Sequence, residues 1–219
     1  MITLVLGGTR SGKSVVAERL VLAHAGPLGY LATGAPTDAD MSTRIEWHRR
    51  RRDARFATVE AGADLAAALR QAPPVPTLVD ALGTWVAAQP EFAAPPVAAA
   101  TNPFALSPDP ATPLDPTTVT DLAAVWANRI DELCRALVGR TAPTVLVSDE
   151  VGMGVHPETE IGRQFRDVLG LVNQRIAEIA DDVLLVVAGR ALHLDRLNPP
   201  DPPDPPDPAD RPDSGDRRR

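Results

Sequence analysis

One stretch of eight residues near the start of the chain constrains the fold more than any other feature. An apolar run at residues 2–6 precedes a match to the pattern G-x-x-x-x-G-K-[ST], and a helix-compatible stretch at residues 15–25 follows it. The eight residues are Gly7, Gly8, Thr9, Arg10, Ser11, Gly12, Lys13 and Ser14. A strand, a glycine-rich turn and a helix in this order predict a phosphate-binding loop. This loop in turn predicts an α/β, P-loop NTPase-type fold of three layers, in which helices flank a mostly parallel central sheet.

The residue types of this loop suit a nucleoside triphosphate with Mg²⁺. Glycines let the backbone curve so that its N–H groups point at anionic oxygens, and the following helix adds the positive end of its dipole. The Lys13 ammonium can reach the β- and γ-phosphates, and the Ser14 hydroxyl can join the Mg²⁺ shell. We therefore predict a site for ATP or GTP with Mg²⁺, in which Lys13 is catalytic.

Composition argues against several classes of protein. The chain has 219 residues, a net charge of −7 and 44% hydrophobic residues, enough for one full core. This acidity argues against general binding of nucleic acid, and every long apolar stretch is interrupted before it could span a membrane. A single cysteine, Cys134, allows no intrachain disulfide, and because an apolar strand opens the sequence we expect no signal peptide. We expect a cytoplasmic protein.

Two stretches of the chain are rich in proline. Residues 89–116 mix proline with Ala, Thr and Ser, and residues 198–219 repeat Asp-Pro-Pro. Neither composition supports a regular helix or strand. We predict one P-loop α/β domain at residues 1–197 with a Pro/Ala-rich inserted loop at about 89–116, and a disordered tail at 198–219.

Further strands are expected to end beside the nucleotide, because ligands of such sheets lie at the carboxyl ends of parallel strands. A short apolar strand at residues 28–32 ends in Ala32, and Thr33 and Gly34 follow it. These three residues are predicted to contact the nucleotide. An ordinary strand-to-helix loop is the alternative for this turn.

Two later strands end in carboxylates. The apolar run at residues 75–80 ends in Asp80, as Walker B strands do, so Asp80 is predicted to contact Mg²⁺ or one of its waters. The run at residues 144–148 leads directly to Asp149. Helices are predicted at 63–71, 81–88, 117–138 and 158–180, and the last strand at 182–189.

The polar stretch at residues 38–52 ends with a histidine and four arginines, His48, Arg49, Arg50, Arg51 and Arg52. On a helix, Arg44 and His48 would lie one turn apart on one face. A run of arginines is usually a solvated helix end, although arginines beside a triphosphate also neutralise its charges. These residues alone favour a structural role for His48.

Together, several segments resemble the bifunctional adenosylcobinamide kinase / adenosylcobinamide-phosphate guanylyltransferase family of cobalamin biosynthesis. Beyond the phosphate-binding loop, the segments are 44–48 with Arg52, 58–60, 149–157, 163–167, 173–174 and 188–189. The stretch E-V-G-x-G-x-x-P, followed by R-x-F-R-D and N-Q, is the most specific part. The resemblance covers roughly residues 1–88 and 117–192.

The resemblance implies two reactions on a corrinoid. The protein would move the γ-phosphoryl group of ATP or GTP to adenosylcobinamide. It would then transfer GMP from GTP, through a guanylylated histidine, to adenosylcobinamide phosphate, giving adenosylcobinamide-GDP. The histidine would be His48, whose neutral imidazole can attack the α-phosphorus. The arginines at 49–52, Glu60 and Asp80 would bind the guanine nucleotide or its metal, and the chain would form a trimer-based homo-oligomer.

The chain departs from the family pattern at one position of the site. The family usually has Asn where this chain has Asp149, and the added charge is expected to alter contacts with Mg²⁺ or substrate. Two other functions stay open. A monofunctional P-loop small-molecule kinase would form no covalent nucleotide, and a GTP-binding regulatory module would use its proline-rich segments to contact partners.

Overall fold

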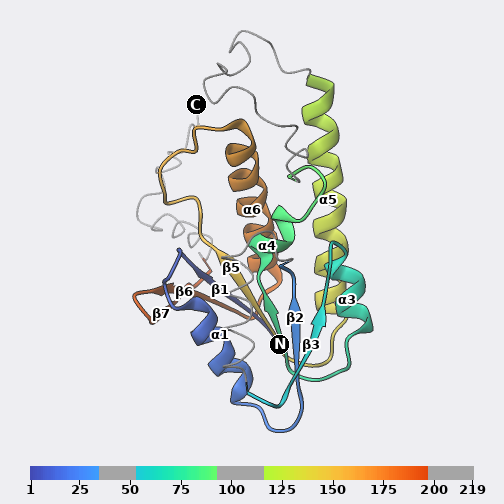
Figure 1. Cartoon of the computed structure of the whole chain (residues 1–219), viewed down its shortest axis with the longest axis vertical. Helices are drawn as coiled ribbons and strands as arrows, with labels where there is room; N and C mark the ends of the chain where they lie inside the picture. The colour runs from blue at the N-terminus through green and yellow to red at the C-terminus, as the bar shows by residue number, and fades with distance from the viewer. Residues whose placement is uncertain (35–52, 93–115, 197–219) are drawn as a thin grey trace, which may run out of the picture.

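The computed structural model describes residues 1–34, 53–92 and 116–196 (Figure 1), and in the last range it describes side chains from residue 124 on. The strands form one seven-stranded sheet with the order β3-β2-β4-β5-β1-β6-β7. Their bounds are β1 (Ile2–Gly7), β2 (Leu28–Ala32), β3 (Phe56–Glu60), β4 (Thr77–Asp80), β5 (Thr144–Asp149), β6 (Asp182–Val187) and β7 (Arg190–His193). Strands β1 to β6 pair in parallel, and β7 is antiparallel to β6.

The helices of the described ranges connect these strands. They are α1 (Lys13–Leu22), α3 (Leu65–Gln71), α4 (Leu82–Ala87), α5 (Pro116–Val138) and α6 (Glu160–Ile179). Two of them begin at a side-chain cap. The Asp64 carboxylate accepts the N–H of Ala67 at 2.8 Å, and the Thr159 hydroxyl accepts that of Gly162 at 3.2 Å. Proline at the first position of α5 needs no N–H partner there.

The sheet is buried on both faces, because successive side chains of a strand point in opposite directions. Leu4 and Leu146 pack with helices α3 to α6 on one face, and Val5 and Val147 pack with α1 on the other. Figure 1 shows α1 well apart from α3, α5 and α6. The predicted three-layer α/β fold with a mostly parallel sheet is confirmed.

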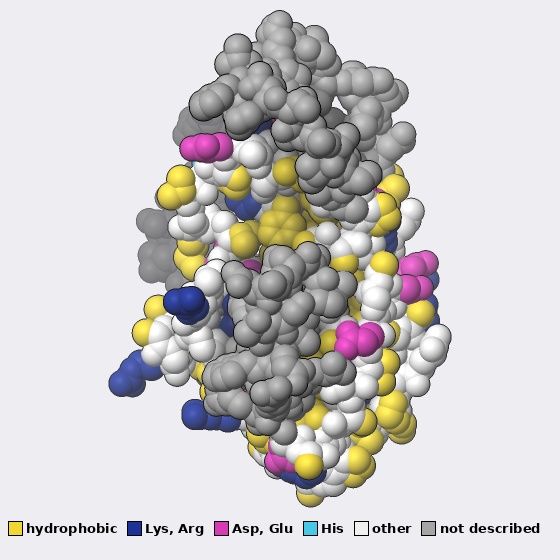
Figure 2. Space-filling model, viewed as in Figure 1, with side chains coloured by type: hydrophobic (Ala, Val, Ile, Leu, Met, Phe, Trp, Pro, Cys, Tyr) yellow, Lys and Arg dark blue, Asp and Glu magenta, His cyan; other side chains and the backbone are white. Residues whose placement is uncertain are grey.

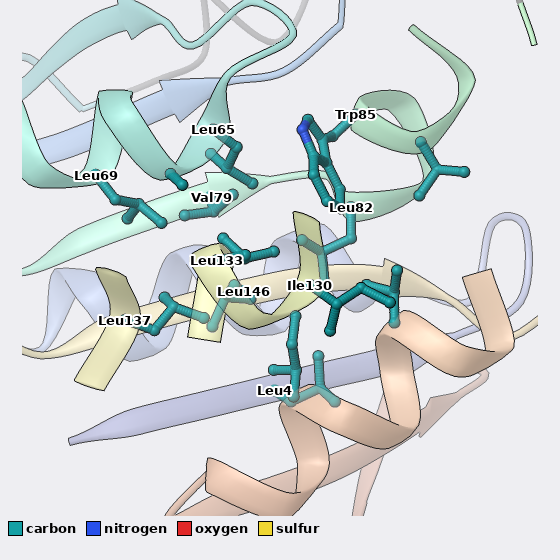
Figure 3. Close-up of a cluster of buried hydrophobic side chains, with 14 of the residues drawn as sticks. Leu4, Leu65, Leu69, Val79, Leu82, Trp85, Ile130, Leu133, Leu137 and Leu146 are labelled. Atoms are coloured by element: carbon teal, nitrogen blue, oxygen red, sulfur yellow. The ribbon is translucent and has the colours of Figure 1, made fainter. Parts of the chain in front are cut away.

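The larger of the two cores lies under α3, α4, α5 and α6 (Figure 3). The side chains labelled there come from three helices and three strands: Leu65 and Leu69; Leu82 and Trp85; Ile130, Leu133 and Leu137; Leu4, Val79 and Leu146. All are at most 2% exposed. Replacing one such leucine by alanine typically costs about 2–5 kcal/mol, so this layer supplies much of the stability that holds the strand ends in place.

The sequence prediction was wrong about the last strand. The run predicted at 182–189 ends at Val187, and β7 follows a two-residue turn at Ala188 and Gly189, whose φ angles are 50° and 75°. Positive φ at both central positions is the geometry of a tight hairpin turn, which is usually built from Asn-Gly. Alanine in the first position carries no such signal.

The chain from residue 89 to residue 92 still belongs to the core. Gln89 is 2% exposed, and its side-chain amide donates to the carbonyls of Ala63 and Trp85 at 3.0 and 3.1 Å. Phe92 is also buried. The rest of the predicted insertion and the predicted tail lie outside the described residues, so the domain boundaries stay predictions.

Candidate active site

The carboxyl ends of five adjacent strands bring most of the described candidate residues to one edge of the sheet. Gly7 is in register with Asp149, and Ala32 is in register with both Asp80 and Glu60. Because β3, β2, β4, β5 and β1 are consecutive, these strand ends form one continuous rim. The rim is where a doubly wound sheet binds its ligands.

Close packing explains the first glycine of the phosphate-binding loop. A Cβ on Gly7 would lie 2.5 Å from Ser11 Oγ and 2.8 Å from the carbonyl oxygen of Val186 on β6. No real side chain approaches that closely, so the loop can turn back over the sheet only from a glycine. The N–H of Ser11 then donates to the Gly8 carbonyl at 3.2 Å, which closes the turn.

The β6–β7 hairpin braces the same loop from outside. Gly189 N–H donates to the Ser11 carbonyl at 2.7 Å. A Cβ on Gly12, whose φ is 95°, would lie 3.1 Å from the Gly189 Cα. The tight turn that sequence reasoning missed therefore supports the loop that the sequence predicted best, and only glycine fits where the two turns meet.

Helix α1 begins at Lys13, directly after the loop. Its N-cap Gly12 offers no side-chain cap, unlike the caps of α3 and α6. The Lys13 N–H donates to Ser11 Oγ at 3.3 Å, and the later N–H groups of the first turn, with the positive end of the dipole, suit an anion such as a phosphate. Ser11, Gly12, Lys13 and Ser14 are half-buried, while Gly8, Thr9 and Arg10 are exposed.

The Lys13 ammonium is held at the mouth of this loop. It donates to the Gly8 carbonyl at 3.3 Å and forms an ion pair with Asp149 Oδ1 at 2.7 Å. Lys13 is also the only lysine of the chain. The structure therefore places the predicted catalytic cation beside a carboxylate from the neighbouring strand.

Asp80 ends β4 on the same side of the sheet as α1. Leu78, two residues earlier, packs in the α1-side core, and residues two apart in a strand share a face. The Tyr30 hydroxyl on β2 donates to Asp80 Oδ2 at 2.7 Å. One oxygen of this half-buried carboxylate is thus oriented by β2.

Thr33 is occupied by the turn that follows Asp80. Its buried hydroxyl donates to the Ala81 carbonyl at 2.6 Å, accepts the Ala81 N–H at 2.8 Å, and lies 2.6 Å from the Thr84 hydroxyl. The peptide bond between Asp80 and Ala81 is cis. Thr33 therefore shapes the start of α4, and the predicted nucleotide contacts of residues 32–34 stay predictions.

The sequence reasoning assigned no role to Asn173, which anchors the end of β5 from α6. Asn173 is 7% exposed, accepts the Ser148 hydroxyl at 2.5 Å and donates to the Asp149 carbonyl at 3.1 Å. The Asn173-Gln174 pair was part of the family resemblance, but that pattern gave Asn173 no partner. Asn173 shows its partners only when α6 packs on the sheet.

The last described candidate is Glu60, at the β3 end of the rim. Glu60 is exposed at the end of the edge strand β3. Five predicted site residues lie outside the described residues. They are the predicted nucleophile His48 and the predicted nucleotide-binding residues Arg49, Arg50, Arg51 and Arg52. Their positions relative to the phosphate-binding loop stay predictions.

Cys134 is a poor candidate for a catalytic nucleophile. Burial raises the pKa of the Cys134 thiol, which packs against the larger core, so it is suited to packing rather than to nucleophilic attack.

Residues 1–34, 53–92 and 116–196 hold no cluster of three or more His, Cys, Asp or Glu side chains that could hold a metal ion. No helix in those ranges is long and apolar enough to cross a membrane. Figure 2 shows acidic and basic side chains on one face, with neither sign covering it.

Comparison with known proteins identifies the family. Residues 3–194 match the model of cobinamide kinase / cobinamide phosphate guanyltransferase. The chain belongs to this family. It is 37% identical over 196 residues to the bifunctional adenosylcobalamin biosynthesis protein CobU of Salmonella typhimurium, covering 86% of this chain and 97% of that protein.

Other relatives agree with this family assignment. CobP of Pseudomonas aeruginosa is 36% identical over 200 residues, covering 87% of this chain and 95% of its own. CobU of Escherichia coli is 36% identical over 194 residues, covering 86% and 97%. Both carry the same bifunctional name. The flagellar accessory protein FlaH of Methanocaldococcus jannaschii overlaps with a TM-score of 0.38 at 11% identity, covering 87% of this chain and 74% of its own. The fold assignment rests on the sheet itself.

Proposed function

We propose that this chain phosphorylates adenosylcobinamide with ATP or GTP and then transfers GMP from GTP, through a guanylylated histidine, to adenosylcobinamide phosphate. The observation that carries the proposal is the phosphate-binding loop at the start of α1 with Lys13, set beside Asp80 and Asp149 on one rim, in a member of this family. The product is adenosylcobinamide-GDP.

In the first step, the loop holds the triphosphate while the γ-phosphoryl group moves to the corrinoid hydroxyl. The P–O bond to the β-phosphate breaks, a P–O bond to the substrate forms, and the hydroxyl proton leaves. Because charge collects on the phosphoryl oxygens in the transition state, the Lys13 ammonium and the first N–H groups of α1 stabilise it. The loop backbone is already fixed by β6 and by Gly189, so little reorganisation is needed.

The donors at the rim fit Mg²⁺ bound with a nucleotide. Mg²⁺ keeps several waters and takes one or two protein oxygens together with phosphate oxygens, rather than a cage of protein ligands. The Ser14 hydroxyl and the Asp80 carboxylate supply such oxygens, and Tyr30 orients the carboxylate. When bound, the ion would neutralise phosphate charge. Ser14 and Asp80 would hold it in place.

In the second step, a ring nitrogen of His48 attacks the α-phosphorus of GTP. A P–N bond forms as the bond to pyrophosphate breaks, and a phosphate oxygen of the substrate then displaces the imidazole. The arginines at 49–52 stabilise the negative transition state, and Glu60 contributes to binding of the guanine nucleotide. The same rim would then hold the departing pyrophosphate.

Covalent labelling tests this proposal. Incubation with GTP labelled at the α-phosphorus should leave GMP on the protein, stable in base and lost in acid, as expected for a phosphoramidate. His48→Ala should abolish the label. His193→Ala is the matched control, because His193 lies on the edge strand β7 with a side chain that is 72% exposed, and it should label like wild type. Equal labelling of His48→Ala and wild type would remove His48 as the nucleophile.

The two alternatives make different predictions. A monofunctional kinase would phosphorylate the corrinoid without carrying GMP, and a regulatory module would bind GTP without binding the corrinoid. Titration of adenosylcobinamide with and without GTP separates a regulatory module from both enzymes. A trimer-based assembly and a cytoplasmic location belong to the same proposal, and light scattering of the purified protein tests the assembly.

A further inference from the structure

The ion pair between Lys13 and Asp149 joins the helix after the phosphate-binding loop to the end of the neighbouring strand. Lys13 Nζ lies 2.7 Å from Asp149 Oδ1, and the two side chains are 13% and 34% exposed. Water screens such a pair less than it screens a pair on an open surface. The cation that is expected to receive phosphate therefore already has a strong anionic partner.

Hydrogen bonds hold the backbone at Asp149 in place from two sides. Asn173 donates to the Asp149 carbonyl at 3.1 Å, and the next N–H along the chain, that of Glu150, donates to the Gly7 carbonyl at 3.1 Å. Gly7 begins the phosphate-binding loop. Strand β5, helix α6 and the loop thus fix Asp149 relative to Lys13.

Helix α4 leaves room for the same side chain. A Cβ on Gly83 would lie only 2.7 Å from Asp149 Oδ2. A residue with a side chain at position 83 would push the carboxylate aside. The phosphate-binding loop, α6 and α4 therefore converge on Asp149: the first two hold its backbone, α4 lies against one carboxylate oxygen, and the other oxygen meets the only lysine of the chain.

We propose that Asp149 is a positioning residue that holds Lys13 at the loop and that a nucleotide must displace from the ammonium in order to bind. This inference rests on the proposed function, because it takes the loop as the triphosphate site. A triphosphate brings several negative charges next to Asp149, and like charges repel at this distance. The carboxylate therefore weakens nucleotide binding, and Mg²⁺ relieves part of that repulsion.

The test compares Asp149→Asn with wild type by calorimetric titration of GTP in EDTA, where no turnover occurs. The variant keeps the shape of the side chain and removes its charge. We expect metal-free GTP to bind about tenfold more tightly to the variant at low salt, with a smaller gain as salt screens the charges. Glu150→Gln is the matched control, because it removes the same charge one residue away, where the carboxylate accepts the Gly152 N–H. It should change the affinity less than about twofold.

A second readout follows Lys13 directly. Because the Asp149 carboxylate holds and covers the Lys13 nitrogen, an amine-directed reagent should modify Lys13 faster in Asp149→Asn than in wild type. Because Lys13 is the only lysine, mass spectrometry needs to separate it only from the chain terminus. In the kinase assay, the variant should show a lower KM for nucleotide with a kcat that does not rise, which is the pattern of a change in uniform binding.

The outcomes separate the two claims. If wild-type protein binds no GTP in either EDTA or Mg²⁺, the proposed function fails. If wild type binds GTP and Asp149→Asn binds it equally or more weakly, the inference about Asp149 is wrong while the site stands. A variant that binds Mg²⁺–GTP more weakly than wild type would make Asp149 a metal ligand and would also overturn the inference.

Discussion

Two cationic side chains at opposite edges of the sheet, Lys13 at the carboxyl edge and Arg140 at the amino edge, are held in different ways. At the carboxyl edge, Lys13 contacts one carbonyl and one carboxylate. At the amino edge, Arg140 follows α5 and donates to the hydroxyls of Thr77 and Thr144 at 2.9 and 3.1 Å. It also donates to the carbonyls of Leu69, Ala72, Pro73 and Val75.

The difference lies in what can replace the partners. Burial lowers the pKa of Arg140, and its planar fork is surrounded by neutral oxygens at the end of α3 and the start of β4. Among the described residues, Arg140 has no carboxylate partner for an arriving anion to displace. The partner of Lys13 is a charge on a half-buried side chain, which an anion can replace. We conclude that Arg140 at the amino edge stabilises the fold, whereas Lys13 at the carboxyl edge can exchange its carboxylate partner for a bound anion.

The largest effect is expected at the carboxyl edge. Lys13→Ala should lower kcat/KM of the kinase step about a thousandfold, or about 4 kcal/mol, because it removes the charge that stabilises the transition state. Urea unfolding should change by less than about 1 kcal/mol, since the pair with Asp149 is partly exposed. Loss of stability comparable to the loss of activity would mean that this edge is structural as well.

Arg140→Ala should show the reverse pattern. It leaves several carbonyls and hydroxyls without a donor, so the free energy of unfolding should fall by about 2–4 kcal/mol. The kcat per folded molecule should stay within about twofold of wild type, because Arg140 lies at the opposite edge from the loop. Arg140→Lys is the control. It keeps the charge but not the fork and should recover only part of the stability. A selective loss of kcat would contradict the division between the edges.

A smaller effect on stability is expected at the hydrogen bond between Ser148 and Asn173, near the end of β5. Asn173→Leu should lower the free energy of unfolding by about 1–3 kcal/mol, because it leaves the buried Ser148 hydroxyl without a partner. Adding Ser148→Ala should recover part of this loss, since removing both partners is less costly than removing one. Chemical denaturation of the two single variants and the double variant measures the coupling. Simple additivity would show that the two side chains do not act as a pair.

Local signals were sufficient for much of the fold. The phosphate-binding loop, strand β2 and the carboxylates at the ends of β4 and β5 follow from short patterns: glycine spacing, apolar runs and what comes next in the chain. The same kind of signal failed at Ala188, where a hairpin turn forms without the usual residues. It also failed at Gln89, whose polar side chain is buried because two carbonyls lie within reach.

By itself, the sequence determined that a phosphate-binding loop opens an α/β sheet and which family the chain resembles. Both depend on residues that are neighbours in the chain. Only the tertiary structure decided that Asp149 pairs with Lys13, that Asn173 anchors the end of β5, and that Gly189 braces the loop. Two of these contacts join residues more than a hundred positions apart, and the third joins β5 to the helix that follows it in the chain. They come together only because helix packing and strand order set the distances at the rim.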